Sequence, residues 1–150
     1  DYPRPSHADE NMTRFNITLS QGVDMVLYAM INSWGGELFV PKIPSYKIID
    51  MANAISPKSK RKIVGIRPGE KLHEEMISET DSLYTYDIGK YYVIIPSVPN
   101  WDIKEFILKN NAKKVKFGFS YKSGENSEWE TVESLRKLIK KNIDPNFKVE

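Results

Sequence analysis

The sequence predicts an α/β fold, a small three-layer-like lobe in which helices alternate with short strands. Three observations predict it: apolar residues recur at helical spacing in several segments, short β-branched or aromatic runs lie between them, and Gly or Pro separates the two patterns. A chain of 150 residues is long enough for one ordinary domain, so a single core is the starting assumption. The three strands that can be predicted make a small sheet, which normally needs a further domain beside it.

The first third of the chain predicts a helix, a strand and a second helix. Apolar residues at helical spacing place the first helix at 19–31, and Thr18 with Gln21 has the form of a capping box. The run 37–40 reads as a short buried strand that stops at a proline. A second amphipathic pattern places a helix at 46–55, with its start at the preceding Pro-Ser pair.

The middle of the chain predicts a strand that leads directly into a helix. The β-branched run 63–66 is typical of a strand, and a Pro-Gly pair breaks it. Apolar residues four apart then predict a helix over 70–78. The residues 81–90 suit a loop, and 91–95 reads as a third strand.

The last third is less regular. Alternating residues over 115–119 predict a short strand or an extended arm. Thr131 can cap a final helix with an apolar stripe opposite a basic face, and the tail 143–150 is expected to fray. The stripe consists of Val132, Leu135, Leu138 and Ile139.

Composition excludes several classes of protein. The net charge of +2 is too small to indicate nucleic acid or an anionic membrane as a partner. The sequence has no cysteine, which excludes disulfides and thiolate sites and is typical of a reducing compartment. No apolar run reaches the length of a membrane span, so a soluble, cytoplasmic protein is expected. His7 and His73, the only histidines, lack partners at metal-ligand spacing, so no metal is expected.

The segment IVGIRPGEKLHE, residues 63–74, is the strongest candidate for a binding site. It predicts Arg67 at the carboxyl end of a strand and a helix start immediately afterwards, and a guanidinium beside free backbone N–H groups suits a phosphate. Glu70 could accept hydrogen bonds from the two hydroxyls of a nucleotide ribose. A purely structural interpretation stays open, in which Glu70 complements the helix dipole and Arg67 makes a surface ion pair.

Arg14 is a second candidate, since it precedes the first helix and could point at the same anion. From the sequence alone, an isolated loop arginine is more often solvated than bound to a ligand. No glycine-rich phosphate loop or nucleophile elbow is present, so recognised parts do not assemble a complete active site. The basic segment 58–62 is interpreted as a solvated loop.

Three blocks of sequence resemble one family. MTRF at 12–15, GGELFVPKIPSYKI at 35–48 and GIRPGEKLHEEMI at 65–77 are similar to the inverting UDP-N-acetylglucosamine 4,6-dehydratases, which are extended short-chain dehydrogenases. YKSGENSEW at 121–129 resembles the ending of the branch that starts pseudaminic acid synthesis. One departure is Ala8-Asp9, where family members often have Thr-Asp.

The resemblance implies that this chain is the C-terminal, substrate-binding part of such a lyase, without its Rossmann domain. In the family, the Rossmann domain holds NADP and the catalytic Asp, Lys and Tyr, so no catalytic or cofactor residue is carried over. The reaction oxidises the sugar at C4 with NADP, eliminates water, returns the hydride to C6 and inverts C5. The resemblance further implies that Arg67 and Glu70 contact the UDP-sugar and that Arg14 lies near the diphosphate.

These inferences give the expected organisation and leave alternatives open. Residues 1–8 are interpreted as a linker or cloning remnant, 9–142 as the substrate-binding domain and 143–150 as the tail. The expected partners are a UDP-sugar and either the missing Rossmann domain or further copies of the chain. Whether the chain itself is an enzyme stays open. The alternatives are a free-standing nucleotide-sugar binding module and a protein-interaction module.

Overall fold

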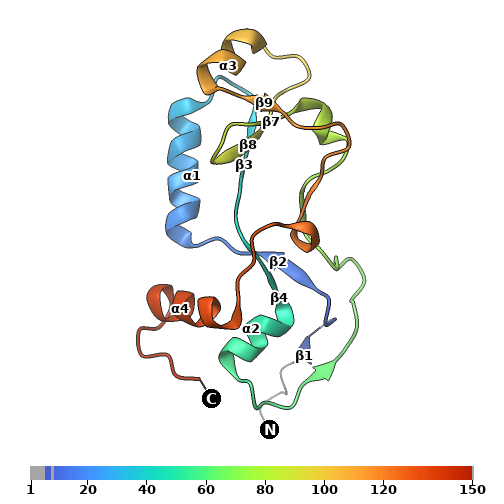
Figure 1. Cartoon of the computed structure of the whole chain (residues 1–150), viewed down its shortest axis with the longest axis vertical. Helices are drawn as coiled ribbons and strands as arrows, with labels where there is room; N and C mark the ends of the chain where they lie inside the picture. The colour runs from blue at the N-terminus through green and yellow to red at the C-terminus, as the bar shows by residue number, and fades with distance from the viewer. Residues whose placement is uncertain (1–5, 8, 150) are drawn as a thin grey trace. The chain divides into compact units, whose positions relative to one another are not determined.

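The computed structural model describes residues 6–7 and 9–149, and its ribbon is a mixture of helices and short open sheets (Figure 1). The mixed α/β class predicted from the sequence is therefore confirmed. The chain divides into two compact units rather than around the single core taken as a starting point. Unit 1 consists of residues 1–16, 44–74 and 122–150, and unit 2 of residues 17–43 and 75–121.

Unit 2 is built on a four-stranded antiparallel sheet of order β3-β8-β7-β9. β8 is one of its two inner strands, and Val93 in β8 is completely buried. The core around this sheet combines Val93 with Tyr86, Ile95, Phe106 and Ala112. The strands are β3 (Leu38–Pro41), β7 (Thr85–Asp87), β8 (Tyr91–Ile94) and β9 (Lys113–Lys114).

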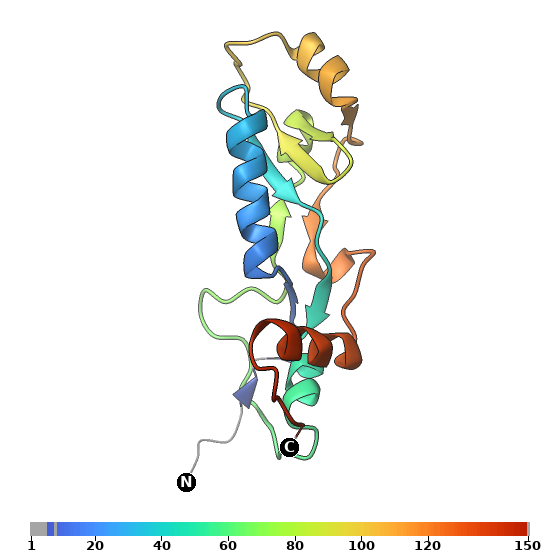
Figure 2. The same ribbon diagram turned by 90° about the vertical axis from the view of Figure 1, so that its left-hand side faces the viewer.

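Two helices of unit 2 pack differently. The first, α1 (Leu19–Asn32), lies alongside β3 (Figure 2) and begins with the expected capping box at Thr18 and Gln21, yet none of its residues is buried. The second, α3 (Ile103–Asn110), is capped by Asp102 and inserts Phe106 into the core. The unit also contains the short 3-10 helix η1 (Asp81–Tyr84) and the strand β6 (Glu75–Ile77).

The core of unit 1 includes residues from two packed helices. α2 (Ile48–Ile55) packs against α4 (Val132–Asn142), burying Ala54 on one side and Leu135 and Ile139 on the other. The remaining elements are short: β1 (Ser6–His7) pairs in parallel with β5 (Lys62–Ile63), β2 (Thr13–Phe15) pairs antiparallel with β4 (Ser45–Lys47), and β10 (Tyr121–Lys122) precedes η2 (Ser123–Glu125).

Several predicted elements are confirmed. The helices expected at 19–31 and after Thr131 are α1 and α4, each with a capping box, and the strands expected at 37–40 and 91–95 are β3 and β8. The helix expected at 46–55 begins only at Ile48, because the residues before it form β4 against β2.

Other predictions are wrong. The strand expected over 63–66 ends at Ile63, since Gly65 takes a left-handed φ of 74° and its neighbours are about half exposed. Residues 81–90 contain η1 and β7 instead of a loop, and α3 was missed. Residues 115–119 follow β9 and contain no strand. None of the described helices is both long and apolar enough to cross a membrane.

The predicted domain limits stay predictions. Residues 1–5 and 8, within the segment interpreted as a remnant or linker, lie outside the described residues. In the tail, Ile143 is 78% exposed, and Phe147 N donates to Asp144 O at 3.0 Å in a final turn.

Candidate functional site

The RPGE motif forms a tight turn rather than a junction between a strand and a helix. Glu70 N donates to Arg67 O at 3.0 Å, and Gly69 has a φ of 81°. Pro at the second position and a left-handed Gly at the third are the residues that a type II turn requires. The Glu70 carboxylate closes the turn a second time, because its Oε2 accepts a hydrogen bond from Arg67 N at 3.1 Å.

The helix predicted over 70–78 does not form, because the backbone after the turn makes hydrogen bonds to segments far away in the sequence. Leu72 O accepts from Thr13 N at 3.0 Å, and Glu74 O accepts from Ser123 N at 2.8 Å. In a helix these carbonyls would accept from residues four positions later. Residues 75–77 then form β6. The helix-dipole argument for anion binding is therefore wrong, and only the side chains of the turn can carry that role.

Arg14 occupies the centre of a charged cluster with Glu70 and Glu74. Its Nε lies 3.2 Å from Glu74 Oε1, and its Nη2 lies 3.9 Å from Glu70 Oε1. Nη1 also donates to Thr13 O at 2.7 Å and to Leu72 O at 3.3 Å. The guanidinium is thus held by two carboxylates and two backbone carbonyls, an arrangement that fixes Glu70 beside β2.

Tyr46 lies across from Arg14 in the β2–β4 pair. Burial raises the pKa of Tyr46 above its ordinary value of 10.0, and the positive charge of Arg14 offsets part of that increase. The phenol is therefore neutral at physiological pH and can donate a hydrogen bond.

Arg67 has the opposite environment to Arg14. Its side chain is exposed, and within the described part of the chain it makes no hydrogen bond or ion pair. The structure thus brings Arg14 and Glu70 into direct contact and places Arg67 in the same turn as Glu70. The Arg67 guanidinium can therefore bind an anion without breaking an ion pair among the described residues, whereas Arg14 is already paired with Glu70 and Glu74.

Three hydrogen-bonded side chains next to this turn, those of Thr13, His73 and Ser123, were not predicted from the sequence. Thr13 Oγ1 lies 2.8 Å from His73 Nδ1 and 2.7 Å from Ser123 Oγ, and Glu74 N donates to Ser123 Oγ at 2.9 Å. Thr13 and Ser123 are buried. The sequence does contain one indication of this group, because His73 lies in the same block as the RPGE motif.

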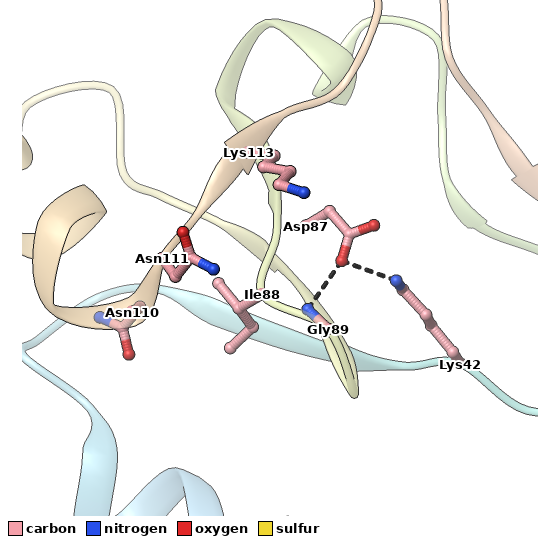
Figure 3. Close-up of a pocket in the computed structure, with 7 residues that line it drawn as sticks. All are labelled: Lys42, Asp87, Ile88, Gly89, Asn110, Asn111 and Lys113. Atoms are coloured by element: carbon pink, nitrogen blue, oxygen red, sulfur yellow. Dashed lines mark hydrogen bonds and ion pairs between the residues drawn. The ribbon is translucent and has the colours of Figure 1, made fainter.

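A separate cavity of about 330 Å³ lies within unit 2 (Figure 3). Asp87 bonds Lys42 Nζ at 2.6 Å and Gly89 N at 2.8 Å, and Lys113 stands near the same carboxylate. Ile88, Asn110 and Asn111 complete the lining. No sequence pattern predicted this cavity, because its residues come from three segments that are far apart in the sequence.

The Asp87 carboxylate is held ionised by these neighbours. Partial burial raises its pKa, but the hydrogen bonds from Lys42 and Gly89, with the charges of Lys42 and Lys113, lower it more. The net result is a pKa below the ordinary value of 3.8.

Comparison with curated proteins identifies similar sequences in two enzyme groups. The chain is 47% identical over 135 residues to the UDP-N-acetylglucosamine 4,6-dehydratase (inverting) of Campylobacter jejuni serotype O:2. The match covers 87% of this chain and 40% of that protein. It is 32% identical over 135 residues to the UDP-glucose 4-epimerase of Rickettsia akari, of which it covers 39%. The chain thus spans about 40% of the length of these relatives.

A solved structure has the same fold over most of the chain. The X-ray structure of Pen from Bacillus thuringiensis superposes with a TM-score of 0.73 at 27% identity, and the match covers 91% of this chain and 40% of that one. The family model described as polysaccharide biosynthesis protein matches residues 6–96, more than half of the chain and a region that includes the RPGE turn. The chain belongs to this polysaccharide biosynthesis protein family.

Proposed function

We propose that this chain is the nucleotide-sugar binding portion of an inverting UDP-N-acetylglucosamine 4,6-dehydratase. The 47% identity to the Campylobacter jejuni dehydratase supports the enzyme class. The observation that carries the binding role is the Arg67 side chain, which is exposed and has no hydrogen-bond or ion-pair partner among the described residues, on a turn that the Glu70 carboxylate closes. The closed turn fixes the backbone that carries this side chain, so less backbone entropy is lost on binding.

Within this proposal, the three predicted site residues have different tasks. Arg67 donates paired hydrogen bonds to the diphosphate, which a planar guanidinium does well. Glu70 Oε1 accepts from a ribose hydroxyl, while its Oε2 keeps the turn closed. Arg14 is proposed to lie near the diphosphate, and its ion pairs with Glu70 and Glu74 orient the Glu70 carboxylate.

The chemistry of the dehydration is proposed to lie outside these 150 residues. The sequence contains no glycine-rich dinucleotide fingerprint between a strand and a helix, so these residues do not fit NADP. The share of this chain is to bind the nucleotide and thereby position the sugar. We assign the protein to the cytoplasm and to surface-polysaccharide or flagellin-glycan synthesis, in the pseudaminic acid branch.

Calorimetric titration with uridine, UMP and UDP tests the proposal. We expect affinity to rise with each phosphate, and Arg67→Ala to weaken UDP binding about tenfold or more, because charge-assisted hydrogen bonds are lost. Lys137→Ala, which removes an exposed cation from α4, is the matched control and should bind as the unchanged chain does. Equal affinity for UDP in Arg67→Ala, or none in the unchanged chain, would refute the binding role.

The exposed apolar face of α1 favours a second candidate function, a protein-interaction module. Leu19, Met30 and Ile31 are between 73% and 86% exposed, and apolar patches of this kind promote association. Sedimentation analysis separates the two candidates. Concentration-dependent self-association without UDP binding would favour the interaction module, and a monomer that binds UDP would favour the nucleotide-sugar role.

A further inference from the structure

The buried hydroxyls beside the RPGE turn form a hydrogen-bond chain with one consistent direction. Glu74 N–H can only donate, so Ser123 Oγ accepts from it at 2.9 Å. If Ser123 then donates to Thr13 Oγ1, the Thr13 proton is left for His73 Nδ1 at 2.8 Å. Every proton of the chain has an acceptor in this direction.

The reverse direction leaves a buried proton without an acceptor. If His73 Nδ1–H donated to Thr13 and Thr13 donated to Ser123, the Ser123 hydroxyl proton would have no partner within the described part of the chain. Ser123 is 0% exposed, so water cannot supply one. An unsatisfied buried hydroxyl is costly, so the forward direction is favoured. His73 therefore accepts at Nδ1 and carries its proton on Nε2.

The His73 ring is also fixed by close packing. A Cβ placed on Gly124 would lie 2.6 Å from His73 Nδ1 and 2.7 Å from Cγ, closer than real Cβ contacts. Only glycine allows the backbone of η2 to approach the ring in this way. The ring is thus held on one face by η2 and at Nδ1 by β2.

These contacts connect η2 with the two segments that carry the proposed nucleotide-binding residues. Thr13 immediately precedes Arg14 in β2, and His73 immediately precedes Glu74. We propose that His73 is a positioning residue: its Nδ1, as an acceptor for Thr13, fixes the segment 67–74 so that the turn presents Arg67 and Glu70 to a nucleotide diphosphate. This inference rests on the proposed function and assigns a role to His73, Thr13 and Ser123.

The tautomer can be tested without any ligand. Long-range ¹H–¹⁵N NMR of the imidazole nitrogens distinguishes the two neutral forms, and the chain has only two histidines, so His7→Gln assigns the spectrum. We expect His73 in the Nε2–H form in the unchanged chain and a mixture of tautomers in Thr13→Val. An Nδ1–H tautomer in the unchanged chain would overturn the proposal.

A pair of substitutions tests whether the Nδ1 acceptor positions the site. The amide of His73→Asn places an oxygen near the position of Nδ1, whereas the longer His73→Gln places its amide near Nε2. We expect His73→Asn to bind UDP within about twofold of the unchanged chain and His73→Gln to lose about fivefold or more, since a net hydrogen bond contributes about that much. Thr13→Ser should likewise keep affinity that Thr13→Val loses.

The outcomes separate this proposal from the proposed function. If the unchanged chain binds UDP and Arg67→Ala does not, but His73→Asn and His73→Gln bind equally, the positioning role is overturned and nucleotide binding stands. Equal losses in both His73 variants, with unchanged thermal unfolding, would also overturn it, because the acceptor would then not be the important feature. If the unchanged chain shows no UDP affinity, the proposed function fails, and the positioning role, which rests on it, fails as well.

Discussion

Arg14 and Arg67 differ in what surrounds them, and that difference determines what each can do. Arg14 is paired with Glu70 and Glu74 and bonds two backbone carbonyls, whereas Arg67 is exposed. The sequence allowed both residues to be selected as candidates. It could not distinguish a guanidinium with partners from one without, because both carboxylates and the Leu72 carbonyl that hold Arg14 lie in residues 70–74, far along the chain from β2.

Gly124→Ala tests the packing of the His73 ring at the scale of one residue. The added methyl group would overlap the ring, so we expect the substitution to lower the free energy of unfolding by about 1–3 kcal/mol. Gly22→Ala, for which no atom lies within 4 Å of the new Cβ, is the sterically neutral comparison. Denaturant unfolding monitored by circular dichroism measures both, and an unchanged midpoint for Gly124→Ala would contradict the packing.

The ionised state of Asp87 makes stability depend on pH. Because its folded pKa is lowered, the carboxylate stabilises the folded state at pH values above the ordinary pKa of 3.8, and this contribution is lost as pH falls through the folded pKa. We expect the stability difference between the unchanged chain and Asp87→Asn to be constant near neutrality and to shrink below about pH 4. Unfolding curves across pH 2–7 measure it, and a difference that grows on acidification would contradict the ion pair with Lys42.

At the scale of elements, local signals were reliable where they did not compete with distant hydrogen bonds. The capping boxes at Thr18 and Thr131 predicted the starts of α1 and α4 correctly. The helical spacing after the RPGE motif failed, because Leu72 and Glu74 bond to β2 and η2 instead. That pairing is a tertiary contact, and a single sequence does not reveal it.

Gly22→Ala is the corresponding test for α1. The position is inside the helix with open space around it, so alanine should raise the free energy of unfolding by roughly 0.5–1 kcal/mol through helix propensity alone. Thermal unfolding should show a small upward shift of the midpoint. A lower midpoint would mean that α1 makes a close contact at this position.

At the scale of the molecule, the division into two units was not predicted. The chain crosses between them several times, so each unit is assembled from segments far apart in sequence. The amphipathic patterns predicted which residues are apolar but not whether a face is covered. α1 has the expected apolar stripe, yet it has no buried residue, whereas the shorter α3 buries Phe106.

Matched valine substitutions test this distribution of the core. Val93→Ala in β8 should cost about 2 kcal/mol, because a completely buried side chain loses two methyl groups and leaves a cavity. Val23→Ala on α1 removes the same atoms from a half-exposed position and should cost much less. Comparable losses in the two variants would mean that α1 is covered in solution, as self-association would produce.

The central claim is that the RPGE turn binds the nucleotide, and residue-resolved NMR during a UDP titration tests it most directly. The account predicts saturable shifts centred on the backbone amides of Gly69 and Glu70, with smaller changes at Arg14. Shifts confined to the cavity lined by Lys42, Asp87 and Lys113, with the turn unaffected, would contradict it.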